Sequence, residues 1–323
     1  PVPAAVTSWT VGPEDAGERL DRHVAARLDI PRNQVQRWIQ DGLVRVAGRE
    51  AKPSYAVAAG DAITCSPPEP SDDRVQPEEG DLQVLYEDAD LVVLDKPAGL
   101  TVHPGAGRTT GTLAHHLLAR YPEMVGVGGP GRPGIVHRLD QGTSGVIVVA
   151  RTPAAYHRLA RAFAAREVSK RYLAIAYGEP KPASGTIDAS IGRHATKRIE
   201  MTVRRDGRPA RTGYRTLGTR AGISLVELDL ATGRTHQIRV HLKHLGHPLV
   251  GDPLYGEARW KGLPKPVQPV LRDFPRPALH AWRLGFEHPL EGKALAFEAP
   301  VPPDLRELWE EATGTAWAFT AAL

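Results

Sequence analysis

Cysteine is almost absent from this sequence, because Cys65 is the only one in 323 residues. A single cysteine excludes an internal disulfide and any zinc site built from cysteine pairs. Long apolar runs are absent too: no stretch of about 18 apolar residues could span a bilayer, and no basic segment leading into an apolar run opens the chain. These absences predict a protein of the reducing cytoplasm that is neither secreted nor inserted in a membrane.

Several motifs of nucleotide, metal and ester chemistry are missing as well. The glycine-rich loop HPGAGRTTGT, residues 103–112, lacks the GK[ST] ending of a phosphate-binding loop and does not match the dinucleotide fingerprint, so we expect a flexible or RNA-facing loop. The histidine-rich segment 236–247 has no HExxH pattern, and its intervening cationic residues oppose a divalent metal ion. The TSG at residues 143–145 is not the GxSxG of a serine hydrolase. We therefore predict no metal site and no serine nucleophile in these segments.

The sequence does contain an ordinary globular composition with an uneven charge. Hydrophobic residues make up 41% and charged residues 24%, and the length suits two domains. Residues 1–66 are electrically neutral, residues 67–90 carry a net charge of −8, and residues 91–323 carry +12. Arginines are densest in residues 193–215, where they suit contact with a phosphate backbone. A solvated hairpin face remains the alternative for that segment.

Domain boundaries follow from one acidic, proline-containing stretch at residues 67–81. It has little to bury and is predicted to be a linker. The linker would separate a small N-terminal domain, residues 1–66, from a large domain, residues 82–323. We expect few contacts between the two.

The small domain shows apolar residues at helical spacing. Two helices are predicted, at residues 19–28 and 32–42, with Pro31 near the start of the second; two short strands are predicted at residues 43–48 and 61–65. The second helix carries Arg32, Gln36 and Arg37, which form a plausible RNA-docking surface. A generic small α/β unit explains the same pattern, because this segment is neutral overall.

The large domain combines many short strands with few helices. Because the two do not alternate regularly, a doubly wound parallel fold is disfavoured and a mixed, mostly antiparallel α+β domain is predicted. One strand pair is expected to turn at Asp206-Gly207. Strands are predicted at residues 82–88, 90–97, 145–151, 171–178, 185–191, 199–203 and 223–230, and helices at residues 110–120, 154–166, 235–245 and 304–312.

Three segments carry residues suited to chemistry. The first, HRLDQGTSG at residues 137–145, places a lone carboxylate, Asp140, in a loop that runs into an apolar strand. On composition alone this is an ordinary turn, but a loop anchored to a buried strand can also hold a carboxylate rigidly at a cleft. The second, SKRYLAIAYG at residues 169–178, places Tyr172 at the start of another apolar strand, where packing with the hydroxyl at the surface is the common role.

The third segment, LATGRTHQIRVHLKHLGH at residues 230–247, predicts a strand that ends at Thr232-Gly233 and a helix that begins near Thr235. Residues three apart share a helix face, so His236 and Arg239 can point the same way. From that face Arg239 can pair with a buried carboxylate.

Together these segments resemble the motifs of the pseudouridine synthases of the large ribosomal and transfer RNA type. HRLD with TSG, KRYLA, and TGRTHQIRVH follow one another in that family's order, and DLVVLDKPAGLTVHPG looks like its leading motif. The resemblance runs from about Glu18 to Pro300, and the N-terminal unit resembles the S4 RNA-binding module. Departures are small: Gln141 and Gly142 fill variable positions, and Ala195 replaces an expected proline.

The resemblance implies a role for each residue of these motifs. Asp140 would be the catalytic carboxylate, acting at the sugar C1′, at the base C6 or in an elimination that forms a glycal, and these alternatives stay open. Arg239 would hold and orient Asp140, and Tyr172 would stack on the target base and serve in proton transfer. Because the target base must be flipped out of folded RNA, Arg138 could fill the vacated stack. The residues implied in RNA contact are His137, Arg138, Arg193, Lys197, Arg198, Arg234, His236, Arg32 and Arg37.

The implied reaction isomerises uridine, and it needs no metal or cofactor because it involves no net redox change and no group donor. Four further segments resemble the family's D type: TVHPGAG, IGRHATKR, HPLVGDPLYG and PALHA. This resemblance implies that the substrate is the helix 69 stem-loop of large-subunit (23S) ribosomal RNA. It also implies that the enzyme is a monomer and that it acts on pre-ribosomal particles. A C type shares the S4 module and the catalytic motifs but acts elsewhere on that RNA. The alternatives are a non-catalytic RNA-binding protein of the same fold and, more distantly, a glycoside hydrolase, which normally needs two carboxylates.

Overall fold

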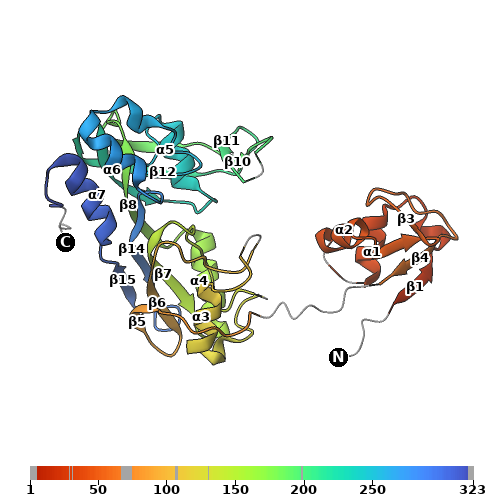
Figure 1. Cartoon of the computed structure of the whole chain (residues 1–323). Helices are drawn as coiled ribbons and strands as arrows, with labels where there is room; N and C mark the ends of the chain where they lie inside the picture. Colours follow the sequence, from red (N-terminus) through yellow and green to blue (C-terminus); the bar gives the residue numbers. More distant parts are fainter. Residues whose placement is uncertain are drawn as a thin grey trace. The chain divides into compact units, whose positions relative to one another are not determined.

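The computed structural model describes residues 6–28, 30, 32–66, 75–105, 108–129, 131–197 and 199–318. The chain separates into two compact units, residues 1–73 and 74–323, each with its own hydrophobic core (Figure 1). Pro31 and the first part of the predicted linker, residues 67–74, lie outside the described residues. Among the helices that are described, none is long and apolar enough to cross a membrane.

The N-terminal unit packs two helices on a four-stranded antiparallel sheet. The two predicted helices are confirmed as α1 (Leu20–Leu28) and α2 (Arg32–Gln40), and they bury their apolar residues together with the sheet. The two predicted strands correspond to β2 (Val44–Val46) and β4 (Ala62–Cys65). The sheet order is β1-β4-β2-β3, which adds β1 (Thr7–Thr10) and β3 (Arg49–Glu50), while a short 3-10 turn, η1 (Pro13–Asp15), follows β1. The sequence did not predict β1, because TSWT is an exposed, largely polar edge strand.

A buried carboxylate joins α1 to α2. The Asp21 side chain accepts hydrogen bonds from Arg19, from Arg32 (Nη2 to Oδ2, 2.9 Å) and from Gln36 (Nε2 to Oδ2, 2.6 Å). These donors, Arg19 above all, hold the pKa of Asp21 well below its usual range. Arg32, a predicted RNA contact, thus forms an ion pair with Asp21 inside the unit, but its side chain remains exposed.

Residues 75–81, the second half of the predicted linker, pack on the large unit. Val75 is buried in its core. The Glu78 carboxylate accepts a hydrogen bond from the Gly111 amide at 2.8 Å, and the Glu78 carbonyl bonds His116 in α3 (Leu113–Arg120). One apolar side chain and one carboxylate therefore attach this segment next to the start of α3, in spite of its acidic composition.

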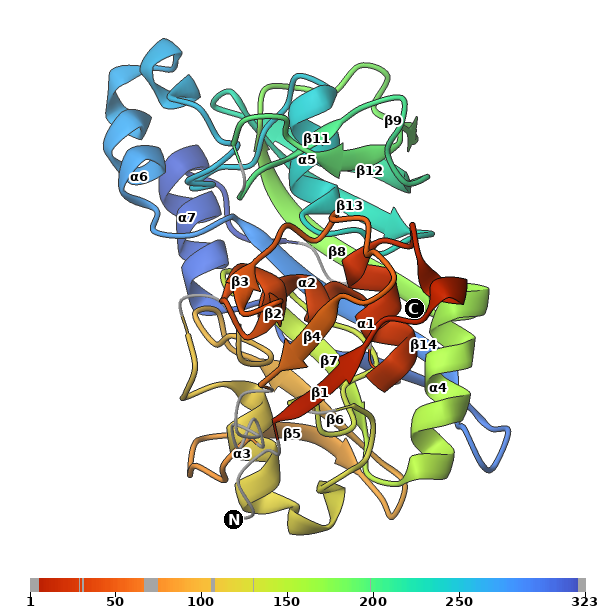
Figure 2. The same cartoon turned by 90° about the vertical axis from the view of Figure 1, so that its right-hand side faces the viewer.

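A nine-stranded sheet forms the centre of the large unit. Its order is β5-β6-β7-β14-β8-β13-β12-β9, with β15 paired to β14, and Figure 2 follows the strands from β6 to β12. Among the described residues neighbouring strands run antiparallel except β7 and β14, which are parallel, and this confirms the mixed, mostly antiparallel α+β prediction. The strands are β5 (Gln83–Glu87), β6 (Leu91–Lys96), β7 (Ser144–Ala150), β8 (Ser169–Tyr177), β9 (Ser184–Asp188), β12 (Arg211–Arg220), β13 (Ile223–Leu230), β14 (Leu279–Glu287) and β15 (Ala294–Glu298).

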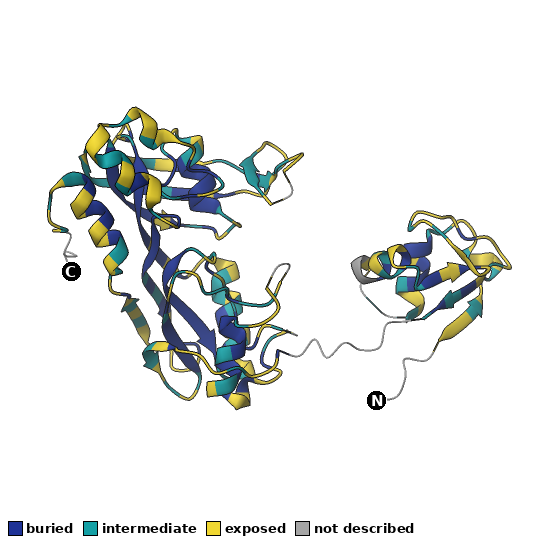
Figure 3. Ribbon diagram, in the orientation of Figure 1, coloured by how far each residue is buried: buried dark blue, intermediate teal, exposed yellow. Residues whose placement is uncertain are grey.

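Helices cover both faces of this sheet, so the central strands are buried on both sides (Figure 3). α3 and α5 (Gln237–His244) share one core with β6, β7 and β8, while α4 (Pro153–Ala165) packs on the opposite face. α6 (Gln268–Asp273) and α7 (Pro303–Thr313) cover a third cluster against β8 and β13. Short 3-10 turns are η2 (Pro122–Met124), η3 (Arg259–Gly262) and η4 (Lys265–Val267).

The predicted strand pair turning at Asp206-Gly207 is wrong. The chain does turn there, since the Gly207 amide bonds the Arg204 carbonyl, but the flanking strands pair with other partners. β11 (Met201–Val203) pairs with β10 (Ile191–Arg193), and β12 lies between β9 and β13. The local sequence predicted the turn correctly, whereas the pairing partners of the flanking strands depend on tertiary packing. The short hairpin of residues 191–203, called the basic arm below, stands out from the sheet in Figure 1.

Candidate active site

Asp140 lies in the loop that leads into β7, as predicted. Its carbonyl accepts the Thr143 amide at 3.0 Å, so the segment is a turn, and its side chain is 21% exposed. Gly145, the second residue of β7, has φ +116°, a backbone conformation that strains any other residue. A Cβ there would lie 2.1 Å from the Ala281 carbonyl oxygen, where β7 meets the parallel strand β14. The glycine of TSG thus lets β7 and β14 approach closely just after the Asp140 loop.

Two buried basic side chains, Lys96 and Arg276, bind the backbone of this loop. Lys96 at the end of β6 donates to the carbonyls of Pro97 and Leu100 and, at 3.4 Å, of Gln141. Burial lowers the pKa of Lys96 to about 7. Arg276 donates to the Gly142 carbonyl at 3.2 Å and pairs with Asp304 of α7. The Gln141 and Gly142 carbonyls are therefore bound by the Lys96 amine and the Arg276 guanidinium, which restricts where the carboxylate can point.

Arg239 in α5 binds Asp140 and a second carboxylate at once. Its Nη1 lies 3.2 Å from Asp140 Oδ2, while its Nε and Nη2 make a fork onto Asp252 at 2.7 and 2.9 Å. The Asp252 side chain is fully buried and also accepts the amides of Leu254 and Tyr255. The predicted pairing with a carboxylate is thus present, and Asp252 orients the guanidinium that reaches Asp140.

His236 meets Asp140 from the same side. It precedes α5, which begins at Gln237 rather than near Thr235, and it adopts the left-handed conformation at φ 56° and ψ 22°. Its Nε2 lies 4.0 Å from Asp140 Oδ2, and its Nδ1 lies 2.8 Å from the Tyr255 hydroxyl. Burial lowers the pKa of His236, so the ring is neutral near pH 7.

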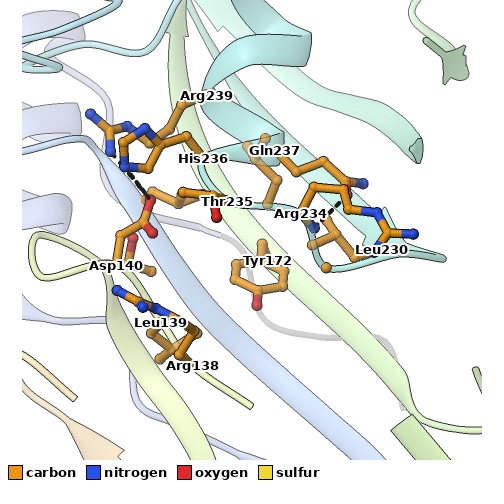
Figure 4. A pocket seen from close by; sticks show the side chains of 14 residues that line it. Arg138, Leu139, Asp140, Tyr172, Leu230, Arg234, Thr235, His236, Gln237 and Arg239 are labelled. Atoms are coloured by element: carbon orange, nitrogen blue, oxygen red, sulfur yellow. Dashed lines mark hydrogen bonds and ion pairs between the residues drawn. The ribbon is translucent and has the colours of Figure 1, made fainter. Parts of the chain in front are cut away.

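Tyr172 extends from β8 into the pocket beside Asp140. Its ring is buried, and burial, reinforced by the charge of Asp140, raises the pKa of its hydroxyl well above the usual value. Within the part of the chain that the structure describes, that hydroxyl has no hydrogen-bond partner. Tyr172 thus presents a neutral phenol ring to whatever enters the pocket (Figure 4).

The pocket adjoins a wider cleft, and Asp140 lies where the two meet. The pocket has a volume of about 100 Å³ and includes Tyr172 with the apolar side chains of Leu230, Ile238 and Leu279. The cleft measures about 860 Å³ and adds Arg108 and Arg276. Both are lined by Arg138, Leu139, Asp140, His236 and Arg239. Of the described residues that line either space, Asp140 is the only one with a carboxylate.

Arg138 and Arg234, both predicted RNA contacts, line the pocket. The Arg138 guanidinium is exposed and lies 3.3 Å from His103 Nε2, in the glycine-rich loop expected to face RNA. Burial and the nearby arginines lower the pKa of His103 to about 4, so it accepts this hydrogen bond as a neutral ring. Arg234 donates through Nε to the Pro209 carbonyl and is half-exposed.

His137 turns away from the pocket. Its ring stacks on Phe163 of α4 at 4.4 Å, and its Nε2 accepts the Val148 amide at 3.1 Å. Burial lowers its pKa to about 3. The structure therefore gives His137 a packing partner and a backbone partner, and we do not retain it among the proposed RNA contacts.

Arg193 and Lys197, the predicted contacts of the basic arm that the structure describes, are not among the described residues that line the pocket or the cleft. In the basic arm Arg193 and Lys197 are exposed, Lys197 paired with Glu200 at 2.9 Å, and Arg198 lies outside the described residues. Arg37 is exposed on α2 of the N-terminal unit. Two histidines of segment 236–247 bind separate partners: His241 bonds Thr212 and the Ala189 carbonyl, and His247 bonds the Tyr177 carbonyl.

Sequence reasoning gave no role to four residues that shape this site: Lys96, Asp252, Tyr255 and Arg276. Lys96, Asp252 and Tyr255 lie in segments that resemble family motifs, and Arg276 directly precedes the PALHA segment. A lone Lys or Asp beside proline carries no periodic signal, so the motif segments were the only indication available.

The chain is similar to known proteins over most of its length. Residues 90–244 match the RNA pseudouridylate synthase family and residues 18–63 match the S4 domain. It is 49% identical to an uncharacterized RNA pseudouridine synthase of Chloroflexus aurantiacus, over 92% of this chain and 90% of that one. It is 41% identical to ribosomal large subunit pseudouridine synthase D of Escherichia coli, over 93% and 92%. The structure of human RNA pseudouridylate synthase domain containing 1 matches with a TM-score of 0.55 at 32% identity, covering 72% of this chain and 90% of the human one.

Proposed function

The chain belongs to the RNA pseudouridylate synthase family, and on that premise we propose that it isomerises uridines of large-subunit ribosomal RNA with Asp140 as the catalytic carboxylate. It is an RNA pseudouridine synthase with an S4 domain that binds RNA. The observation that carries the proposed site is the single carboxylate at the junction of pocket and cleft, bound by Arg239 and facing Tyr172. A glycoside hydrolase would normally need a second carboxylate there.

The proposed reaction is balanced within the uridine itself. The bond from uracil N1 to ribose C1′ breaks, the base rotates, and C5 bonds to C1′; N1 gains a proton and C5 loses one. The ionised Asp140 serves as a nucleophile at C1′, as a nucleophile at C6, or as the base of an elimination that forms a glycal, and all three need the negative charge that Arg239 stabilises.

The base enters the small pocket in this proposal. The apolar side chains around Tyr172 suit a flat ring, and the neutral phenol can stack on it. The nucleotide must leave its helix to arrive there, and the exposed Arg138 guanidinium at the mouth can occupy the stack that it vacates. His236 and Arg234 would contact the flipped nucleotide from the other side of the mouth.

The RNA surface is proposed to extend from the cleft onto the basic arm and, separately, onto the N-terminal unit. The net charge of +12 on residues 91–323 supports phosphate contact. Arg193, Lys197 and Arg198 would contribute on the arm, and Arg32 and Arg37 on α2. We further propose a cytoplasmic monomer acting on pre-ribosomal particles.

The choice of uridines is tested by mapping pseudouridine in ribosomal RNA from a strain that lacks the gene. The D-type motifs predict that pseudouridine is lost only from the helix 69 loop. Reintroducing the wild-type gene should restore it there, and Asp140→Asn should not. Pseudouridine missing elsewhere with helix 69 intact would refute the D-type specificity and leave the chemistry standing. An unchanged map would favour the non-catalytic RNA-binding alternative.

Removing the N-terminal unit is expected to weaken RNA affinity about tenfold or more, because two linked modules bind with higher avidity than one. The cut should fall before residue 74, since Val75 and Glu78 pack on the large unit. Affinity is measured by filter binding and the rate by single turnover at saturating RNA, which should change little. A matched variant cut before residue 82 should melt lower than the first; equal melting temperatures would contradict the packing role of residues 75–81.

A further inference from the structure

Tyr255 contacts three parts of the site: His236, Arg239 and the basic arm. The family motifs give Tyr255 no role in these contacts. Its side chain is 1% exposed, and its hydroxyl lies 2.8 Å from both His236 Nδ1 and the amide nitrogen of Met201 in the basic arm. The Arg239 guanidinium lies over its ring, 4.9 Å from the centroid. One phenol thus contacts both groups that reach Asp140.

The two hydrogen bonds of this hydroxyl decide which ring nitrogen of His236 carries the proton. The Met201 amide can only donate, so the phenol oxygen accepts that bond. The phenol hydrogen is buried, and His236 Nδ1 is the acceptor within reach among the described residues. Burial raises the pKa of Tyr255 and lowers that of His236, so both are neutral and the assignment holds near pH 7. His236 then carries its proton on Nε2, the atom that faces Asp140.

The backbone of His236 indicates that this orientation is enforced. A left-handed conformation is strained for a residue with a Cβ, and such strain persists only where the surroundings impose it. It places the ring where the pocket and the cleft meet, and the ring lines both. Packing alone would not require a histidine whose two nitrogens face a buried phenol and an open carboxylate.

We propose that Tyr255 is a positioning residue that acts through His236, fixing its Nε2–H toward Asp140 and the nucleotide bound there. The proposal rests on the proposed function and deepens it. Nε2–H is a donor for an oxygen of the flipped nucleotide, beside the reacting bond. Without the phenol hydrogen the neutral His236 ring can carry its proton on either nitrogen. In part of the molecules Nε2 then has no proton to donate toward Asp140 and the nucleotide.

The first test compares Tyr255→Phe with Tyr214→Phe. Tyr214 is also buried, and its hydroxyl donates to the Pro182 carbonyl outside the pocket, so it controls for the loss of one hydroxyl. With 5-tritiated RNA at saturation, Tyr255→Phe should lower the single-turnover rate about tenfold and the RNA affinity less than about threefold. Tyr214→Phe should stay within about twofold in both. Equal rates for the two variants would overturn the proposal, as would a loss of affinity alone, which would assign the hydroxyl to the arm.

A double-mutant cycle tests whether Tyr255 acts through His236. His236→Asn removes the ring and keeps a residue that tolerates the left-handed backbone. In that background Tyr255→Phe should change the rate less than about twofold, and an undiminished tenfold loss would refute the coupling.

The tautomer itself is measured without any activity. Nitrogen-15 spectra of histidine-labelled protein, with His236→Asn to assign the ring, should show one neutral Nε2–H tautomer in the wild type and a mixture in Tyr255→Phe. A mixture already present in the wild type would overturn this inference even if the enzyme is active. A wild type that forms no pseudouridine would instead count against the proposed function, while the spectra still decide the tautomer.

Discussion

Asp140→Asn is expected to lower the rate of pseudouridine formation on the order of 10⁴-fold, the scale of removing an essential catalytic group. The amide keeps the size of the side chain and can still accept the hydrogen bond of Arg239. It removes the negative charge, which every version of the proposed mechanism needs. Because Arg239 keeps its fork on Asp252, the variant should fold normally and bind RNA within tenfold of wild type.

Single-turnover release of tritium from 5-tritiated uridine in RNA measures this rate directly, because C5 loses its hydrogen in the reaction. Asp273→Asn is the matched control, since among the described residues that exposed aspartate pairs only with its neighbour Arg272 at the surface. Turnover of Asp140→Asn near the control would end the assignment of the catalytic carboxylate. If calorimetry shows that Asp140→Asn is unfolded, its loss of rate would no longer support Asp140 as the catalytic carboxylate.

Arg239→Ala is expected to reduce both catalysis and stability. Asp140 loses its cation and its orientation, and a misplaced catalytic group costs about 100-fold in rate. Asp252, fully buried, is left without its partner, and removing one member of a buried ion pair costs about 3–5 kcal/mol of unfolding free energy. Chemical denaturation and single-turnover kinetics measure the two losses separately.

Arg239→Lys separates the two effects. A lysine keeps the charge near Asp252 but cannot reproduce the fork and reach Asp140 as well, so stability should recover more than the rate. Arg215→Ala is the control, because its carboxylate partner Glu227 keeps Arg171. A folded Arg239→Ala protein with a rate within a few-fold of wild type would show that the pairing with Asp140 is not needed.

The elements with strong local patterns were predictable. α1, α2, α3, α4, α5 and α7 follow apolar residues at helical spacing, and β6, β7 and β13 are apolar runs that read as buried strands. A strand was expected after Asp206-Gly207, where β12 begins, but its partners and its extent to Arg220 were missed, because RTGYRTLGTR mixes arginines with glycines and only pairing with β9 and β13 fixes the strand. β14 was missed for a related reason, since its place between β7 and β8 comes from a distant part of the chain.

The turn around Asp140 and the basic charge of residues 91–323 were determined by the sequence itself, because they follow from residue types and their local order along the chain. The tertiary structure alone decided which side chains meet at that turn. Arg239 reaches Asp140 across 99 positions and Asp252 across 13, and the Tyr255 hydroxyl reaches Met201 across 54. Such bonds leave no periodic trace in a sequence, because they form only after the sheet has brought its loops together.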